Sequence, residues 1–203
     1  MPLPPTFKEI KSQDWNTPEW LVSLVKQALG TIELDPCSNV GSVVGAQTTF
    51  ALPEHNGLKE SWSNFKTVYI NPPFNRTYIH EDQQIAIGAK EYQSLTKAKK
   101  AKYYSTTIKE WVEKASQAHY NFNTQSIILV PANVDTLVWH NIIFKDIDVK
   151  RYNVLTGASA CIFRGRLEFM GATGPAPMAC SAIYYGSEHD KFKNVFKSYG
   201  YIL

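Results

Sequence analysis

The chain has 203 residues, of which 44% are hydrophobic and 19% charged, and its formal net charge is +3. This length is enough for one domain with a sizeable core, and no apolar run is long enough to span a bilayer. The N-terminus lacks the pattern of a signal peptide, and the three cysteines lack the spacing of a zinc site or disulfide framework, so we expect a cytoplasmic protein with no membrane partner and no metal.

The first half of the chain predicts one helix and two short strands. Thr17 is expected to cap the helix and Pro18 to occupy its first position, and apolar residues then recur at helical spacing until Gly30. Strands are predicted over Thr31–Leu34 and Lys66–Ile70. The residues between these two strands are expected to be irregular.

The second half alternates strands with helices. Residues 76–106 are polar and lysine-rich, and we expect them to form a partly helical insertion that leaves the core. Further helices are predicted over Thr107–Gln117 and over Asp135–Phe144, with Asp135 as a cap, and further strands over Ser126–Val130, Ala160–Phe163 and Ser181–Tyr185. This alternation predicts an α/β fold with a largely parallel sheet and helices on both faces.

The most informative motif is Asn71-Pro72-Pro73-Phe74, which directly follows the second strand. Its prolines fix φ and remove two backbone donors, and a residue before proline avoids the helical region. The Asn71 side-chain oxygen and the Pro72 carbonyl would then face one small space as acceptors. A planar amine such as adenine N6 could donate both hydrogens to them while its ring stacks on Phe74. Asn-Pro-Pro also opens ordinary loops, but a strand's carboxyl end is where α/β sheets bind ligands.

A related motif, Asp35-Pro36-Cys37, follows the first strand. A carboxylate at this position could accept hydrogen bonds from the ammonium or hydroxyl groups of a ligand, and small residues after it let the ligand approach the backbone. S-adenosylmethionine offers such groups and carries no phosphate, which agrees with the lack of a phosphate-binding loop. Alternatively, Asp35 only caps the next element. The two motifs are expected on adjacent strands.

The predicted insertion also has a nucleic-acid signature. It holds Lys97, Lys99, Lys100 and Lys102, with tyrosines on either side. Basic residues alternating with aromatic residues could contact phosphates and stack on bases. The alternative is a solvated, lysine-rich helix face.

The order of these motifs resembles the phage-type Dam DNA N-6-adenine methyltransferases, over most of residues 14–185. The likeness lies in Trp15-Asn16-Thr17-Pro18, Leu34–Cys37, Asn56-Gly57-Leu58 with Trp62, Asn71–Phe74, Ile108–Val112, Val130-Pro131-Ala132 with Asp135, Thr136 and Trp139, and Arg164–Phe169. Two features depart from the family. Asn56 stands where the family more often has an acidic residue, and the segment 76–106 is longer than usual.

The resemblance implies a single-domain, Rossmann-like fold, S-adenosylmethionine as methyl donor and adenine in double-stranded DNA as acceptor. The catalytic residues would be Asn71, Pro72, Pro73 and Phe74, and the cofactor would contact Trp15, Thr17, Pro18, Asp35, Pro36, Cys37 and Asn71. We assign DNA contacts to Asn75, Arg76, Lys99 and Lys100. Transfer would be direct, with the base flipped out of the duplex and Cys37 lining the pocket. A phage or prophage protecting its DNA from restriction is the implied setting.

The chemistry of the motif alone leaves other substrates open. The same loop could hold cytosine N4, adenine in RNA or a protein glutamine amide, and only the family resemblance favours adenine in DNA. A non-catalytic nucleic-acid-binding protein of the same fold is the alternative from a different class. Cofactor binding separates that alternative from the enzymes.

Overall fold

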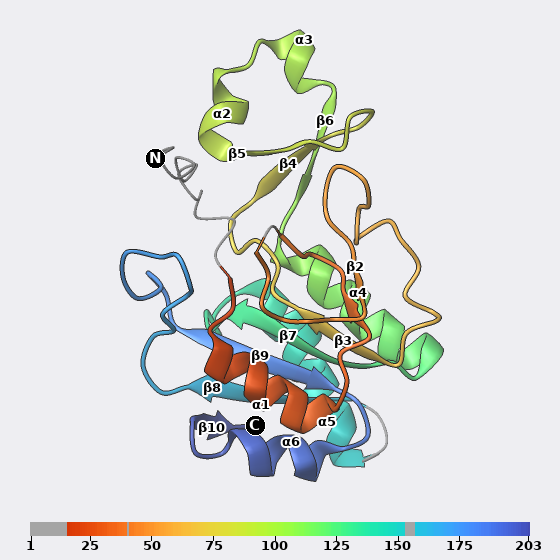
Figure 1. Ribbon diagram of the computed structural model, residues 1–203, viewed down its shortest axis with the longest axis vertical. Coiled ribbons are helices and arrows are strands. Elements are labelled where there is room, and N and C mark those ends of the chain that lie inside the picture. The colour runs from red at the N-terminus through yellow and green to blue at the C-terminus, as the bar shows by residue number, and fades with distance from the viewer. Residues whose placement is uncertain (1–15, 40, 153–156) are drawn as a thin grey trace, which may run out of the picture.

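A mixed β-sheet organises the part of the chain that the computed structural model describes, which is residues 16–39, 41–152 and 157–203 (Figure 1). Within these residues the sheet has seven strands in the order β10-β8-β9-β7-β3-β1-β2. Their bounds are Leu34–Asp35 (β1), Thr48–Thr49 (β2), Thr67–Ile70 (β3), Gln125–Pro131 (β7), Ala158–Phe163 (β8), Cys180–Tyr185 (β9) and Gly200–Ile202 (β10).

The direction of the strands changes at β7. The pairs β2–β1, β1–β3 and β3–β7 are parallel, whereas β7–β9, β9–β8 and β8–β10 are antiparallel. Among the seven described strands of this sheet, only β9 and β10 therefore run against the direction of the others. The expected mostly parallel sheet is present, with an antiparallel half that the sequence did not indicate.

Helices cover both faces of this sheet, as predicted (Figure 1). Helices α1 (Glu19–Leu29) and α6 (His189–Phe196) pack on one face. Helix α4 (Ile108–Phe122), a π-helical turn η1 (Trp139–Ile143) and helix α5 (Phe144–Tyr152) pack on the other.

Strand β7 shows how the sheet divides the core. Its fully buried residues alternate, with Ile127 and Leu129 in the core under α1 and α6, and Ile128 and Val130 in the core under α4. Successive side chains of a strand point to opposite faces, so an unbroken apolar strand predicts cover on both sides. No helix in the described ranges is long and apolar enough to cross a membrane.

The start of α1 differs from the prediction in one informative way. The helix begins at Glu19, after Pro18, and no side-chain hydrogen bond caps it. Thr17 is therefore not its cap, because the Thr17 hydroxyl is committed to Tyr69 instead. The predicted end is correct, since Gly30 terminates the helix with φ +82°.

Other elements were misplaced or not anticipated. Asp135 does not cap a helix, because it lies exposed in a turn and the helical segment from Trp139 to Tyr152 starts after it. The short edge strand β2 lies in the stretch expected to be irregular. Helix α6 and strand β10 follow the last predicted strand.

Residues 77–106 form an arm that projects from the sheet (Figure 1, top). It contains strands Thr77–His80 (β4), Ala86–Gly88 (β5) and Tyr103–Thr106 (β6) and short helices Ala89–Ser94 (α2) and Lys97–Lys100 (α3). The strands pair antiparallel in the order β5-β4-β6. Part of the segment is helical, as predicted, but its three-stranded framework was not.

Candidate active site

The two strand-end motifs lie side by side. Strands β1 and β3 pair in parallel with Leu34 opposite Val68, so the same offset brings Cys37 level with Asn71. The Cys37 thiol forms a hydrogen bond with the Asn71 backbone. The adjacency predicted from the sequence is therefore correct, and both motifs belong to one site at the carboxyl edge of the sheet.

A chain of hydrogen bonds positions the Asn71 side chain. Asn71 Nδ2 donates to Thr17 Oγ1 at 3.2 Å, and Thr17 Oγ1 lies 2.9 Å from the Tyr69 hydroxyl. Thr17 and Tyr69 are both buried. Because Nδ2 and Oδ1 diverge from the same carbon, the bond to Thr17 directs Asn71 Oδ1 away from Thr17. The oxygen that the sequence nominated as an acceptor is therefore held in a defined direction.

Tyr69 is a site residue that sequence reasoning missed. It lies within β3, two residues before Asn71, and is completely buried. Burial raises the pKa of Tyr69 well above its ordinary value, so the hydroxyl stays protonated and available to Thr17. The signal was a tyrosine inside an apolar strand, since a buried tyrosine hydroxyl needs a hydrogen-bond partner.

The ring of Phe74 rests on the core. Phe74 is partly buried and meets Phe169 edge to face, with ring centroids 6.0 Å apart and an interplanar angle of 80°. Edge-to-face contacts of this kind fix the orientation of a ring. Phe169 ends the segment Arg164–Phe169 that contributed to the family resemblance, so this distant segment supports the site.

Asp35 is a buried carboxylate with weak local partners. It is 4% exposed, Cys37 N donates to its Oδ1 at 3.3 Å, and Ser42 Oγ donates to its Oδ2 at 3.5 Å. Burial raises the pKa of Asp35 to about 6, although hydrogen bonds from Cys37, Ser38 and Ser42 oppose the shift. No ion pair to Asp35 forms within the described residues. The carboxylate is therefore suited to accept a positively charged or hydroxyl-bearing ligand.

Cys37 is not prepared to act as a nucleophile. Burial, followed by the nearby charge of Asp35, raises the pKa of the Cys37 thiol well above its ordinary value. The thiolate is the nucleophilic form of cysteine, so a neutral thiol agrees with the predicted lining role.

Gly57 brings a third segment against the Asp35 turn. A Cβ atom on Gly57 would lie 1.7 Å from the carbonyl oxygen of Pro36, so this close approach requires glycine. Trp62 Nε1 donates to the Gly57 carbonyl at 3.0 Å and holds the loop in place. Asn56 turns its Nδ2 toward the arm, to Gln84 Oε1 and the Tyr104 hydroxyl.

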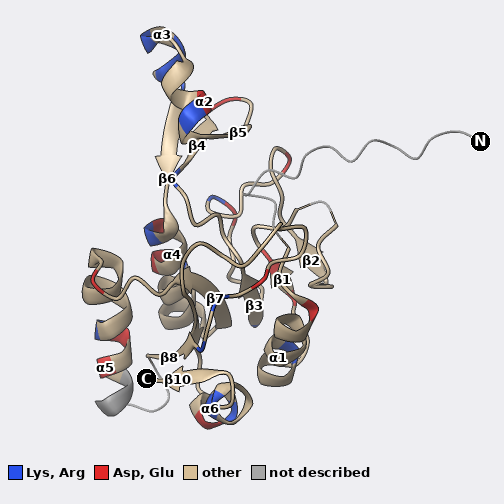
Figure 2. Cartoon of the chain, turned by 90° about the vertical axis from the view of Figure 1, so that its left-hand side faces the viewer, with Lys and Arg blue, Asp and Glu red and all other residues tan. Residues whose placement is uncertain are grey.

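The remaining predicted residues lie at varying distances from this site. Pro18 is buried, and its carbonyl starts α1 by accepting from Leu21 and Val22. Asn75 and Arg76 are exposed where the loop meets the arm, and Arg76 Nη1 donates to Ser105 Oγ at 3.0 Å. Lys99 and Lys100 lie on α3, at the far end of the arm (Figure 2), so the structure does not bring them to the loop of residues 71–74. Trp15 lies outside the described residues.

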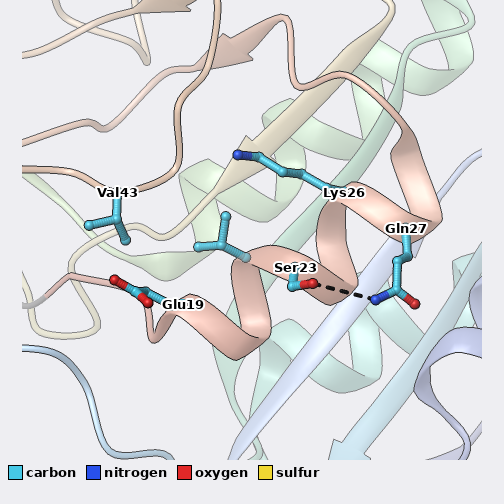
Figure 3. Close-up of a pocket in the computed structure, with 6 residues that line it drawn as sticks. Glu19, Ser23, Lys26, Gln27 and Val43 are labelled. Carbon is cyan, nitrogen blue, oxygen red and sulfur yellow. Dashed lines mark hydrogen bonds between the residues drawn. The ribbon is translucent and has the colours of Figure 1, made fainter.

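A separate hollow of about 480 Å³ lies on the surface of α1 (Figure 3). Its polar lining includes Ser23 and Gln27, which hydrogen-bond each other. The hollow is lined by Glu19, Val22, Ser23, Lys26, Gln27 and Val43. None of these residues belongs to a predicted motif, although Glu19 follows Pro18 and Val43 follows Ser42 in the chain. In the described ranges, no group of three or more His, Cys, Asp and Glu residues could hold a metal ion.

Comparison with known families gives an assignment that agrees with these motifs. The family model for DNA N-6-adenine-methyltransferase (Dam) matches residues 5–183. The chain belongs to this family. The resemblance seen over most of residues 14–185 is thus confirmed, and Dam membership supports methylation of adenine in DNA.

More distant comparisons add little to the Dam assignment. A search of curated proteins found no significant match. The structure of the Type IIL restriction-modification enzyme MmeI in complex with DNA aligns at 15% identity with a TM-score of 0.34. The alignment covers 75% of this chain and 20% of that one. This likeness is too remote to assign a fold or an activity.

Proposed function

We propose that this protein transfers a methyl group from S-adenosylmethionine to N6 of adenine in double-stranded DNA, on a single Rossmann-like domain into which residues 76–106 are inserted. The observation that carries the proposal is the joining of Asn71-Pro72-Pro73-Phe74 with the buried Asp35 turn at one sheet edge. Ligands bind at the carboxyl ends of strands in sheets of this kind.

The residues around Asp35 fit the cofactor. S-adenosylmethionine supplies an electrophilic methyl group on a sulfonium and offers an ammonium and ribose hydroxyls as donors. Asp35 is a buried carboxylate without an ion-pair partner in the described part of the chain, and such a group accepts hydrogen bonds from donors of this type. Pro36 and Cys37 would border the cofactor beside it, and Thr17, Pro18 and Trp15 would do so from the start of α1.

The catalytic loop would hold and polarise the target amine. Adenine N6 is a weak nucleophile because its lone pair is delocalised into the ring. Asn71 Oδ1 and the Pro72 carbonyl would accept its two hydrogens and stabilise positive charge as it develops on nitrogen. Groups preorganised toward developing charge contribute about 2.7–4 kcal/mol each in well-studied sites. The bond from Asn71 Nδ2 to Thr17 supplies that preorganisation.

Phe74 would stack on the flipped adenine. A duplex hides N6, so the target base must leave the helix, and aromatic side chains replace its lost stacking. The contact with Phe169 holds the Phe74 ring at a fixed angle to receive the base.

The proton that leaves N6 goes to water in this proposal. His80 Nδ1 accepts from the backbone N–H groups of Asp82 and Gln83, and His119 Nδ1 pairs with the Thr124 carbonyl. Each of these two histidines therefore uses its Nδ1 atom within the fold. The methylated ammonium is acidic enough to lose its proton without a dedicated base.

DNA would reach the site past Asn75 and Arg76, with Lys99 and Lys100 contacting phosphates farther along the duplex. Both lysines lie on α3, and Lys99 is exposed. The setting that fits this activity is the cytoplasm of a bacterium or a phage-infected cell, where methylation protects DNA from restriction.

Methyl transfer to an unmethylated DNA duplex tests the proposal. Labelled S-adenosylmethionine is supplied to the native protein, to Asn71→Ala and to Asn194→Ala, an exposed control on α6, and the product nucleosides are identified. We expect N6-methyladenine from the native protein and the control. A loss of about two to three decades of rate is expected for Asn71→Ala, because one preorganised acceptor is removed.

The other outcomes separate the alternatives. Methyl on cytosine would move the assignment to cytosine N4. Transfer to RNA or to a protein amide, but not to DNA, would overturn the choice of substrate. A native protein that binds DNA and fails to bind S-adenosylmethionine in equilibrium dialysis would be a non-catalytic binding protein.

A further inference from the structure

The positive charge of this chain is concentrated at the end of the arm. Four lysines fall within residues 97–102, and no acidic residue lies between Glu91 and Glu110. The rest of the chain holds 17 of the 21 Lys and Arg residues and all 18 Asp and Glu residues. Without this basic tip, defined as Lys97, Lys99, Lys100 and Lys102, the chain would carry no net positive charge.

The basic tip is exposed and not neutralised. Lys97, Lys99 and Lys102 are exposed, and Lys100 Nζ lies 5.6 Å from the centre of the Tyr92 ring. None of the four forms an ion pair with a carboxylate of the described residues. In Figure 2 the ribbon is coloured for Lys and Arg at α3, at the end of the arm farthest from the sheet. A group of unpaired lysines on a projecting element is complementary to a polyanion.

The arm is internally ordered. Tyr78 stacks on Tyr92 with ring centroids 3.7 Å apart, and His80 meets Tyr103 edge to face at 5.0 Å. Ile79 is buried within the arm. These contacts join β4 to both α2 and β6, so the basic tip is carried on a packed unit.

A partly buried hydrogen-bonded group joins this unit to the body. Asn56 Nδ2 donates to Gln84 Oε1 at 2.9 Å and to the Tyr104 hydroxyl at 2.6 Å, while Asn56 Oδ1 accepts from Leu58 N at 3.0 Å. We call Asn56, Gln84 and Tyr104 the latch. Lys59 Nζ also lies 4.7 Å from the centre of the Tyr104 ring.

The latch connects the arm to the candidate cofactor turn. Asn56 precedes Gly57, which lies directly against the Pro36 carbonyl. Both hydrogens of the Asn56 amide are used by the arm, whereas an aspartate at this position would have no hydrogen to donate. The asparagine that departs from the family pattern is therefore explained by its contacts with the arm.

We propose that the arm is a DNA-binding surface whose basic tip contacts the sugar-phosphate backbone beside the target adenine, and that Asn56 is the positioning residue for it. The choice of DNA as ligand rests on the proposed function. The arm begins three residues after Phe74, so a duplex presenting a base to the loop passes the arm. The latch sets the distance between the phosphate contacts and the catalytic loop.

Two matched lysine variants test the surface. The first is Lys97→Gln/Lys99→Gln/Lys102→Gln. The control is Lys191→Gln/Lys193→Gln/Lys197→Gln, whose lysines lie on α6 and at its C-cap and are also exposed. Binding of an unmodified DNA duplex is measured by fluorescence anisotropy without cofactor, across a range of salt concentrations. Each phosphate contact contributes about 0.9 to the slope of log K against log salt. We expect the slope to fall by about 2–3 in the arm variant and to stay unchanged in the control.

The latch is tested by Asn56→Asp in the native protein and in the arm lysine variant. In the native background we expect the KM for DNA to rise on the order of tenfold, because an aspartate cannot donate to Gln84 Oε1 or to the Tyr104 hydroxyl. The Kd for S-adenosylmethionine should stay unchanged. In the arm lysine variant the same substitution should raise the KM for DNA little further, because substitutions of coupled residues have non-additive effects. Tyr104→Phe keeps the ring beside Lys59 and should cause a smaller rise in the KM for DNA.

The outcomes are distinct from those of the proposed function. Equal loss of DNA binding in both lysine variants would contradict the proposal that the arm is a DNA-binding surface. Tighter binding of an RNA duplex than of a DNA duplex would contradict it as well. If Asn56→Asp raised the KM for DNA equally in both backgrounds, Asn56 would have a general structural role. That result would contradict the proposal that Asn56 positions the arm. A native protein that transfers no methyl group but binds DNA through the arm lysines would refute the reaction and leave the surface standing.

Discussion

Asn71 and Thr17 are 54 positions apart in the chain, yet Asn71 Nδ2 donates a hydrogen bond to Thr17 Oγ1 at 3.2 Å. The contact joins the Asn-Pro-Pro-Phe loop after β3 to a residue just before the start of α1. Thr17 is in turn held by the buried Tyr69. The direction of the Asn71 amide is therefore set by the fold and does not depend on the substrate.

Thr17→Val should lower turnover while keeping the volume of the side chain. Loss of an orienting hydrogen bond of about 1 kcal/mol predicts a rate about five- to tenfold lower. The same change leaves the buried Tyr69 hydroxyl without Thr17, which costs about 1–3 kcal/mol of unfolding free energy. Methyl-transfer rates and thermal unfolding measure the two effects.

The double variant Thr17→Val/Tyr69→Phe separates orientation from stability. Removing both hydroxyl groups should restore most of the unfolding free energy, because the buried Tyr69 hydroxyl is no longer left without Thr17. The methyl-transfer rate should remain low. If the double variant regained both the unfolding free energy and the methyl-transfer rate, Thr17 would act on stability alone.

The sequence predicted two central strands of the sheet, whereas the strand expected over Thr31–Leu34 is observed as Leu34–Asp35. The runs before Asn71 and at Ser126–Val130 are apolar without interruption, which indicates strands covered on both faces, and the structure confirms them as β3 and β7. Both motifs could be placed because proline and a polar residue directly after an apolar strand mark its carboxyl end.

Asp35→Asn should stabilise the protein above pH 6. Burial raises the pKa of Asp35 to about 6 from 3.8, so the folded state binds a proton more tightly than the unfolded state. The free energy of unfolding therefore falls as the pH rises between these two values. Asp35→Asn should raise the free energy of unfolding by on the order of 1–3 kcal/mol at pH 7–8. Below about pH 4 it should not raise the free energy of unfolding. Urea unfolding at several pH values measures this.

The same variant should weaken binding of S-adenosylmethionine. The native protein should lose cofactor affinity as the pH falls through about 6, because a protonated Asp35 no longer attracts a cation. Asp35→Asn should bind weakly at every pH in this range. Isothermal titration provides the measurement, and equal affinity of both proteins would remove Asp35 from the cofactor site.

Gly57→Ala should disrupt the site, because the added Cβ would lie 1.7 Å from the Pro36 carbonyl oxygen. Overpacking of a close contact costs about 1–3 kcal/mol or more, and the displaced atoms belong to the Asp35 turn. We expect a lower unfolding temperature and weaker cofactor binding. Gly174→Ala is the matched control, since a Cβ there would meet nothing within 4 Å. Similar losses in both variants would contradict the steric explanation.

Cys37→Ser should keep methyl transfer within about one order of magnitude, since the thiol has a raised pKa and is assigned no covalent role. Serine retains the size of the side chain and cannot replace a cysteine nucleophile at a similar rate. Complete loss of transfer in a variant with native unfolding temperature would point to covalent catalysis. Mass spectrometry of the native protein with DNA would then show a protein–DNA adduct.

Local patterns could not predict contacts made over a long distance. Thr17 has every feature of a helix cap, and only the approach of Tyr69, 52 residues away, shows that its hydroxyl is used elsewhere. The strands of the arm are short, and they are joined by tyrosine contacts that no periodicity marks: Tyr78 stacks on Tyr92, and Tyr92 meets Tyr103 edge to face. Asn56 resembled a lost acidic residue until its partners Gln84 and Tyr104 were known.

Thr77 and Thr106 are paired directly across β4 and β6, so the chain leaves the body and re-enters it at neighbouring positions. An excursion with adjoining ends imposes no length or shape on what lies between them. Lineages could therefore exchange the intervening residues without altering the register of β3 or β7. The DNA sequence that such a protein recognises could then diversify rapidly, while the strands that position the site of the reaction stay the same.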